Sequence, residues 1–354
     1  MLPIVKGMEE LPKTELRRGW TTGACATAAT KAALRRLWGG AFGADVQITL
    51  PKGETPTFAL EHTDAGDGWA AAGIIKDAGD DPDVTHGALI IVRVAKSDGG
   101  VVFKAGEGVG TVTKAGLPIG VGEPAINPVP RLMMDEVVAE AAALYGETPN
   151  VTITVSIRDG AALALKTWNP RLGIVGGLSV LGTTGIVRPF SCAAWIASIH
   201  RGIDVSIANG ATHVAGCTGA TSEKVVQDLY GLPDHAMLDM GDFAGGMLKY
   251  LVKHPVERVT IGGGIGKITK LAQGAIDLHS GRSQVDFDGL ATLMNDPRLA
   301  EANTALGAYQ IAGQPLAQAV ADAALRQVNT RFAGPSYDIV IIDRAGVVLA
   351  RAGA

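Results

Sequence analysis

Between residues 213 and 275 the sequence alternates short apolar segments with longer helical ones. The expected strands cover residues 213–215, 236–239 and 258–261, and the expected helices cover residues 222–230, 243–253 and 265–275. Alternation at this spacing is typical of βαβ units, whose parallel strands form a sheet that helices cover. We therefore predict a mainly parallel sheet in the second half of the chain. A final hairpin is expected over residues 337–350, with Gly346 at its turn.

The first half has a different pattern of short, alternating segments joined by Gly, Pro and Asp turns. The expected strands cover residues 46–50, 57–62, 69–75, 88–96, 101–104, 151–157 and 162–167. This pattern indicates a mostly antiparallel sheet. Thr21 or Thr22 can cap a helix over residues 24–38, whose many alanines allow close packing against a sheet. A second helix is expected over residues 132–145.

Together these patterns predict a mixed α/β protein of two domains. Residues 1–168 are expected to form an N-terminal α+β domain with a mostly antiparallel sheet. Residues 169–354 are expected to form a C-terminal α/β nucleoside-binding domain with a mainly parallel sheet. A chain of 354 residues is long enough for two such cores.

Composition argues against several classes of protein. A net charge of −4, 5% aromatic residues and the lack of a basic tract disfavour nucleic-acid binding. No apolar run approaches the ~20 residues that cross a bilayer. Cys25, Cys192 and Cys217 form no CxxC pair, so neither a disulfide framework nor a structural zinc site is expected. We expect a cytoplasmic protein without a membrane partner, and a homo-oligomer stays possible.

Three glycine-rich turns, at residues 182–185, 216–221 and 262–267, follow expected strands of the second half. In an open parallel sheet ligands bind outside the carboxyl ends of the strands, so these turns are expected to share one edge. Asp239 lies 20 positions beyond Gly219, where an acidic group commonly binds a ribose diol. The predicted cofactor-binding residues are Gly216, Thr218, Gly219, Asp239, Gly262, Gly263, Gly264 and Gly266. The P-loop spacing is absent at Lys267, which disfavours ATP hydrolysis.

Residues 169–191 combine a glycine-threonine turn with an expected helix start. Thr183, Thr184 and Gly185 offer hydroxyls and close backbone approach, and Arg188 adds a permanent cation. Ser191 is a good N-cap for a helix over residues 192–200. The segment is interpreted as the floor of a site for an anionic or polar ligand, although a tight turn between core elements suits the residues equally well.

Residues 76–87 place four carboxylates within seven positions, beside His86. Clustered carboxylates are costly unless solvent, a cation or hydrogen-bond donors neutralise them. A solvated acidic turn is the simpler interpretation. The alternative is a site that binds a cation or takes a proton, with imidazole as a group that titrates near neutrality. The spacing is not that of an EF-hand loop.

Five motifs resemble those of the cobalt-precorrin-5B C1-methyltransferase family (CbiD). They are GWTTGACATAATKAA, KDAGDDPDVTHG, GEGVGTVTKAGLPIGVGEPAINPVPR, NPRLGIVGGLSVLGTTGIVRPFS and GGGIGKITKLAQG, in the family's order over roughly residues 19–281. Family members often carry TTGTC where this chain has Ala24, which is a small departure.

The resemblance implies transfer of a methyl group from S-adenosylmethionine to C1 of cobalt-precorrin-5B, giving cobalt-precorrin-6A in oxygen-independent cobalamin biosynthesis. Holding donor and acceptor in line is the main catalytic demand. Cobalt belongs to the substrate, so no protein-bound metal is expected. The substrate carries several carboxylates, which need local cations.

Under this hypothesis the expected substrate-binding residues are Thr21, Thr22, Gly23, Thr183, Thr184, Gly185, Arg188 and Lys267. The candidate catalytic residues are Asp77, Asp81 and His86, of which Asp77 or Asp81 would take a proton from the ring. Two other functions stay open: an NAD(P)-dependent precorrin reductase and a non-catalytic tetrapyrrole carrier.

Overall fold

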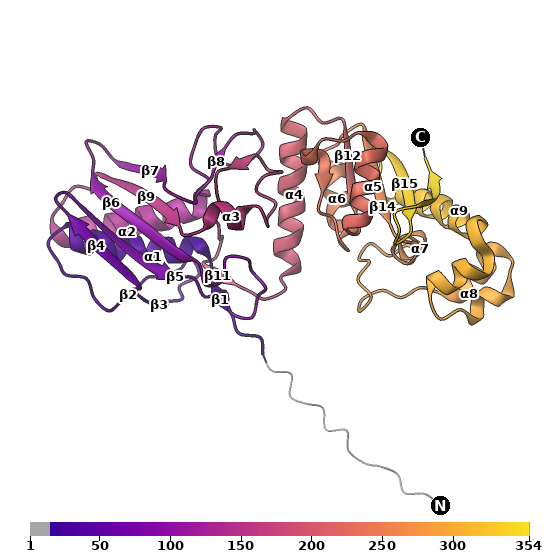
Figure 1. Ribbon diagram of the computed structural model, residues 1–354, viewed down its shortest axis with the longest axis horizontal. Helices are drawn as coiled ribbons and strands as arrows, with labels where there is room; N and C mark the ends of the chain where they lie inside the picture. The colour runs from indigo at the N-terminus through magenta and orange to yellow at the C-terminus, as the bar shows by residue number, and fades with distance from the viewer. Residues whose placement is uncertain (1–14, 354) are drawn as a thin grey trace, which may run out of the picture. The chain divides into compact units, whose positions relative to one another are not determined.

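The structure is a computed structural model that describes residues 15–353. Its residues group into two compact units whose segments interleave along the chain (Figure 1). Unit 1 contains the residues up to 109 together with 124–166 and 177–190. Unit 2 contains residues 110–123, 167–176 and the residues from 191 onward. The domain boundary expected after residue 168 stays a prediction.

Unit 1 is built on a five-stranded sheet in the order β4-β5-β6-β9-β7. The strands are β4 (His62–Gly66), β5 (Trp69–Ile75), β6 (Leu89–Lys96), β7 (Val101–Ala105) and β9 (Val151–Ile157). All neighbours pair antiparallel except β7 and β9, which are parallel. Two helices, α1 (Thr22–Leu37) and α2 (Pro128–Tyr145), pack together, and α1 lies against β5 and β6 (Figure 1). A small hairpin joins β2 (Asp45–Gln47) to β3 (Thr57–Ala59).

The sequence of α1 explains its central place in unit 1. Thr21 is the N-cap, and its Oγ1 accepts a hydrogen bond from the backbone N–H of Ala24 at 3.2 Å. Ala24, Ala28 and Ala29 are fully buried, because methyl side chains let the helix approach the sheet closely. The helix predicted over residues 24–38 is confirmed to within two residues at its start and one at its end.

Unit 2 is built on a second five-stranded sheet, in the order β13-β12-β14-β15-β16. The strands are β12 (His213–Cys217), β13 (Met237–Leu238), β14 (Arg258–Gly263), β15 (Ser336–Ile342) and β16 (Val348–Ala352). The first four are parallel, and β16 pairs antiparallel with β15 in the predicted final hairpin. The chain is thus a mixed α/β protein with antiparallel strands in unit 1 and a mostly parallel sheet in unit 2.

Helices cover both faces of the parallel sheet. They are α4 (Cys192–Ala208), α5 (Ala220–Tyr230), α6 (Ala244–Lys253), α7 (Ile265–Ala272), α8 (Phe287–Met294) and α9 (Ala305–Arg331), with short 3-10 turns η1 (Asp234–Ala236) and η2 (Pro297–Glu301). One face and its helices form the larger core. On the other face Val226 of α5 packs in a smaller core with Cys217 and Val340. Among the described residues, no helix is long and apolar enough to cross a membrane.

Two local predictions are wrong. The strand expected over residues 162–167 is instead a short helix, α3 (Gly160–Ala164), followed by turns. Asp159 takes a left-handed φ of 58°, and Gly160 packs so closely on Gly108 that a Cβ would lie 2.2 Å from its carbonyl oxygen. This contact ends the extended run. The helix expected over residues 192–200 continues to Ala208, because its later turns bury Ile199, Ile203 and Val205.

Candidate functional site

The carboxyl ends of β12, β13 and β14 lie next to one another at one edge of the parallel sheet. β13 pairs on one side of β12 and β14 on the other, so the direction of strand addition reverses at β12. Ligands of open α/β sheets bind at such a reversal. The backbone N–H of Thr218 donates to the carbonyl oxygen of Gly262 at 3.0 Å. Two of the predicted glycine turns, 216–221 and 262–267, are therefore neighbours at this edge.

The third glycine turn, at residues 182–185, does not belong to this edge, so its predicted place is wrong. The strand before it, β10 (Ile174–Val175), pairs antiparallel with β8 (Thr111–Val112) instead of joining the parallel sheet. The strand after it, β11 (Ile186–Val187), pairs with β1 (Gly19–Trp20) in unit 1. A short strand takes whichever partner the tertiary fold supplies, and its own residues do not specify that partner.

In unit 1 this turn lies against the start of α1. The backbone N–H of Thr21 donates to Gly185 O at 2.9 Å, and the N–H of Gly23 donates to Leu181 O at 3.0 Å. Thr21 and Thr22 are 7% and 4% exposed. The structure thus brings together two groups of predicted substrate-binding residues, Thr21–Gly23 and Thr183–Gly185. Of the predicted substrate-binding residues in unit 1, Thr183 and Arg188 are exposed.

The predicted cofactor glycines play two different parts at the sheet edge. A Cβ at Gly216 would lie 2.3 Å from the Met247 sulfur, and one at Gly263 would lie 2.7 Å from Thr218 Oγ1. Gly262 is equally crowded by Val226 and Cys217. At these three positions neighbouring side chains pack directly against the glycine. By contrast, nothing lies within 4 Å of a Cβ at Gly219, and Gly264 and Gly266 have only contacts beyond 3.6 Å. Their backbone is open to a ligand.

Asp239 follows the last residue of β13 and is half-buried. Burial, and next the negative charge of Glu223, raise the pKa of its carboxyl group to about 6. The Arg171 guanidinium and a hydrogen bond from Trp168 oppose that rise. Arg171 itself forms an ion pair with Glu223. At neutral pH Asp239 is therefore mostly ionised in a partly dry site, which suits an acceptor for two ribose hydroxyls.

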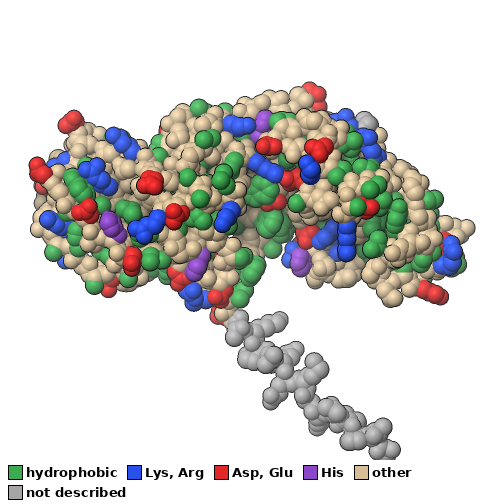
Figure 2. All heavy atoms as spheres, in the orientation of Figure 1, with side chains coloured by type: hydrophobic (Ala, Val, Ile, Leu, Met, Phe, Trp, Pro, Cys, Tyr) green, Lys and Arg blue, Asp and Glu red, His purple; other side chains and the backbone are tan. Residues whose placement is uncertain are grey.

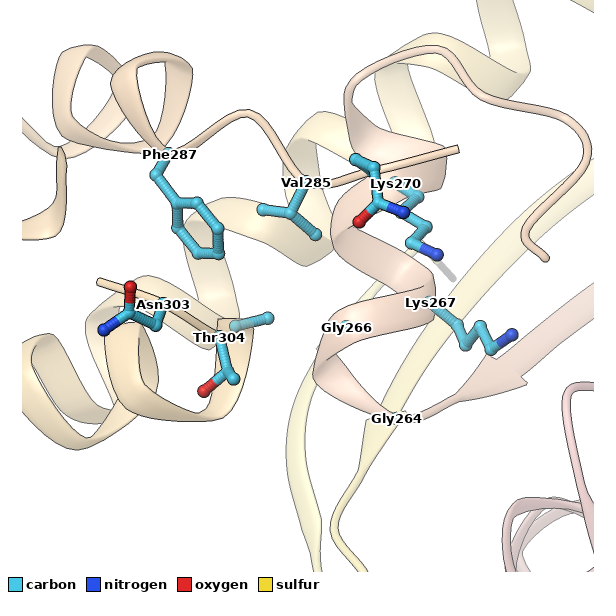
Figure 3. Close-up of a pocket in the computed structure, with 10 residues that line it drawn as sticks. Gly264, Gly266, Lys267, Lys270, Val285, Phe287, Asn303 and Thr304 are labelled. Carbon is cyan, nitrogen blue, oxygen red and sulfur yellow. The ribbon is translucent and has the colours of Figure 1, made fainter. Parts of the chain in front are cut away.

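A cavity of about 310 Å³ lies at the start of α7, beyond the end of β14 (Figure 3). Its lining residues are Gly264, Gly266, Lys267, Lys270, Gln284, Val285, Phe287, Asn303, Thr304 and Ala305. The Lys267 side chain points away from Phe287 and Asn303 (Figure 3), and its Nζ donates to Asp242 Oδ1 at 2.5 Å and to Leu278 O at 3.0 Å. No sequence motif marks the lining residues between positions 284 and 305, so they are not among the predicted site residues.

A larger groove of about 770 Å³ runs along α6 and α4. Lys249 and Lys253 contribute exposed cations, and the ring of Tyr250 stacks on His200 with centroids 4.0 Å apart. None of these residues lies among the predicted site residues. On the face shown in Figure 2, acidic and basic side chains are interspersed, so the carboxylates of a polyanionic ligand would meet individual cations.

The acidic segment after β5 is a folded loop of unit 1 in which hydrogen-bond donors neutralise the carboxylates. Lys76, 1% exposed, pairs with Asp83 and donates to Thr85 Oγ1 at 2.5 Å. Asp81 Oδ1 accepts from the backbone N–H of Phe190 at 2.9 Å. Within residues 15–353, no group of three or more His, Cys, Asp or Glu side chains is placed to hold a metal ion.

The three candidate catalytic residues of this loop differ in their surroundings. Hydrogen bonding from Arg17, with a smaller contribution from the Gly79 N–H, lowers the pKa of Asp77 to about 2. His86 Nδ1 accepts from the Ala78 N–H at 3.1 Å and lies 3.8 Å from Asp77 Oδ1. The neutral imidazole that fits this contact carries its proton on Nε2. Asp77 is thus a poor proton acceptor, and His86 presents a donor.

Comparison with known proteins gives the family. The model of the CbiD family matches residues 9–189. A protein of Brucella anthropi named cobalt-precorrin-5B C(1)-methyltransferase is 57% identical over 356 residues, which cover 96% of each chain. The chain belongs to the CbiD family. A protein of the same name from Paramagnetospirillum magneticum is 56% identical over 94% of this chain and 97% of its own.

A crystal structure titled as the CbiD cobalamin biosynthesis protein of Archaeoglobus fulgidus is also similar. It is 28% identical, covers 75% of this chain and 83% of its own, and has a TM-score of 0.42. The CbiD family model includes α1, the acidic loop and the 182–185 turn, and it ends before the parallel sheet. The sheet edge with Asp239 is covered by the CbiD relatives that span nearly the whole chain.

Proposed function

We propose that this chain is a cobalt-precorrin-5B C1-methyltransferase that uses S-adenosylmethionine, in the cytoplasm. The observation that carries the proposal is 57% identity to a protein of that name over 96% of both chains. The sheet edge of unit 2 supports it, since open glycine backbone and Asp239 stand where α/β sheets bind nucleosides. The alternatives of a reductase or a carrier have no comparable support.

The residues at the sheet edge fit the methyl donor. Asp239 offers a carboxylate to the ribose diol, while Gly219 and Gly264 let the ligand approach the backbone. The donor supplies an electrophilic methyl group when bound. The protein's task is then to hold donor and acceptor in line and to exclude water, which requires no covalent nucleophile.

The substrate side of the proposal uses residues of unit 1. Thr183, Thr184 and Arg188 present hydroxyls and a cation to the acetate and propionate groups of the macrocycle, and the 182–185 turn packs on Thr21–Gly23. Lys267 of unit 2 is already paired with Asp242, so it contributes only if that ion pair opens.

The acidic loop contributes proton handling and orientation. Asp81 is the proton acceptor that we retain, because one of its oxygens is held by Phe190 and no contact to the other is seen among the described residues. His86 is positioned to donate from Nε2 to a substrate carboxylate. Asp77, with its low pKa, pairs with Arg17 rather than taking a proton.

An anaerobic assay tests the function directly. The purified chain is incubated with methyl-labelled S-adenosylmethionine and cobalt-precorrin-5B, and label in the macrocycle is measured by mass spectrometry. We expect one labelled methyl group per macrocycle, loss of transfer in Asp239→Asn, and normal transfer in Asp288→Asn, an exposed aspartate of α8. Macrocycle binding without transfer would support the carrier instead, and NAD(P)H-dependent reduction would support the reductase.

A further inference from the structure

The cavity at the start of α7 has an apolar wall and a polar wall. Val285 and Phe287 form one side, Gly264 and Gly266 form another, and Asn303 and Thr304 close a third (Figure 3). Ligand cavities commonly measure about 300–1,000 Å³. At about 310 Å³ this cavity suits a nucleoside and is too small for a macrocycle.

The polar wall carries a free amide. Asn303 is exposed, and no hydrogen bond from its side chain is seen within the described part of the chain. The next residue, Thr304, caps α9 by accepting from the Gly307 N–H at 3.0 Å, so the backbone that carries Asn303 is held in place. An asparagine amide matches the edge of adenine, because it donates to N7 and accepts from the N6 amino group.

The apolar wall can cover the faces of a base whose edge the amide binds. The Phe287 ring faces the cavity opposite Gly266 (Figure 3), and Val285 lies beside it. A planar base between an aromatic ring and glycine backbone buries both of its faces, which is a favourable arrangement for stacking. Glycine at position 266 leaves room there, since a Cβ would meet only Ala305, at 3.7 Å.

The loop that carries the proposed ribose site contacts the helix that borders the cavity. The loop after β13 carries both Asp239 and Asp242, and Asp242 Oδ1 accepts from Lys267 Nζ at 2.5 Å. Lys267 belongs to the cavity wall. This ion pair therefore joins the loop that carries the proposed ribose carboxylate to α7, whose first residues line the cavity.

We propose that this cavity is the adenine subsite of the methyl donor, with Phe287 and Val285 against the ring and Asn303 recognising its amino edge. The inference rests on the proposed function, since it assigns part of the same nucleoside ligand. It adds four residues, Val285, Phe287, Asn303 and Thr304, that lie outside the sequence motifs of the family resemblance.

Calorimetric titration of the full chain with S-adenosylhomocysteine tests this subsite. Asn303→Ala is expected to weaken binding about tenfold, the effect of losing a pair of neutral hydrogen bonds. Phe287→Ala is expected to weaken it at least as much. Leu293→Ala, an exposed leucine of the same helix α8 outside the cavity, should bind like the wild type.

A base analogue separates recognition from a structural effect. S-inosylhomocysteine replaces the amino group by a carbonyl, so it should bind the wild type about tenfold more weakly than S-adenosylhomocysteine, whereas Asn303→Ala should bind both equally. Unchanged affinity in both cavity variants, with a wild type that binds, would overturn the subsite and leave the function standing. Failure of the wild type to bind S-adenosylhomocysteine would overturn the methyl donor and the subsite together.

Discussion

Replacing Asp239 by asparagine should stabilise the folded protein while it removes nucleoside binding. The carboxyl pKa rises from an ordinary 3.8 to about 6, with burial as the main cause and Glu223 as the next. Such a rise means that the ionised group disfavours folding, by about 3 kcal/mol if fully counted. Because Asp239 is only half-buried, solvent screening reduces the expected gain to about 1–2 kcal/mol.

The sign of this stability change follows from the linkage between proton binding and folding. With a raised pKa, the folded state holds the proton more tightly, so this group's favourable contribution is complete below the unfolded pKa near 4 and is lost as pH rises through about 6. Asp239→Asn should therefore exceed the wild type in unfolding free energy at pH 7.5 and match it near pH 4.

Urea unfolding at the two pH values measures the stability difference, and titration with S-adenosylhomocysteine measures the affinity. Asp288→Asn, on an exposed aspartate of α8, is the matched control and should change neither quantity. An Asp239→Asn protein that is less stable than the wild type at pH 7.5 would refute the reasoning, because the carboxylate would then be a net stabilising group. Retained affinity would refute its assignment to the ribose.

Three further predictions concern other parts of the chain. Gly263→Ala should lower the free energy of unfolding by about 1–3 kcal/mol in urea, because its Cβ would collide with Thr218. Gly219→Ala, whose Cβ meets nothing, should unfold like the wild type and bind the nucleoside more weakly. Arg17→Ala should return the pKa of Asp77 from about 2 toward its ordinary value, measured by NMR titration, and an unchanged pKa would contradict the assigned cause. Lys76→Met should lower the free energy of unfolding by about 2–4 kcal/mol, because it leaves Asp83 without its cation. A variant with the unfolding free energy of the wild type would show that this ion pair does not stabilise the fold.

Much of unit 2 could be predicted because the sequence patterns that specify its strands and helices each span only a few residues. Each strand from β12 to β14 is an apolar run, and each is followed by a helical segment, so the parallel sheet follows from chain order and the handedness of crossovers. Asp239, expected as the last residue of its strand, directly follows β13. The cap at Thr21 and the alanine pattern of α1 likewise determine that helix from neighbouring residues.

The roles of individual glycines could not be predicted. Gly216 and Gly219 look alike in the sequence, yet Met247 crowds the first and nothing crowds the second. The turn at 182–185 was assigned to the wrong sheet because β10 is two residues long and takes β8 as its partner. The pKa values of Asp77 and Asp239 differ because Arg17 hydrogen-bonds to Asp77, whereas burial, and next Glu223, raise the pKa of Asp239.

The sequence by itself determined the class of fold, the family and the mainly parallel character of the second sheet, since periodicity, caps and motifs act over a few residues. Only the tertiary structure decided which glycines stay open, that the pKa of Asp239 is raised, and that Phe287 and Asn303 line a cavity beside Gly266. These properties depend on contacts between residues far apart in the chain, and local sequence patterns carry no information on them.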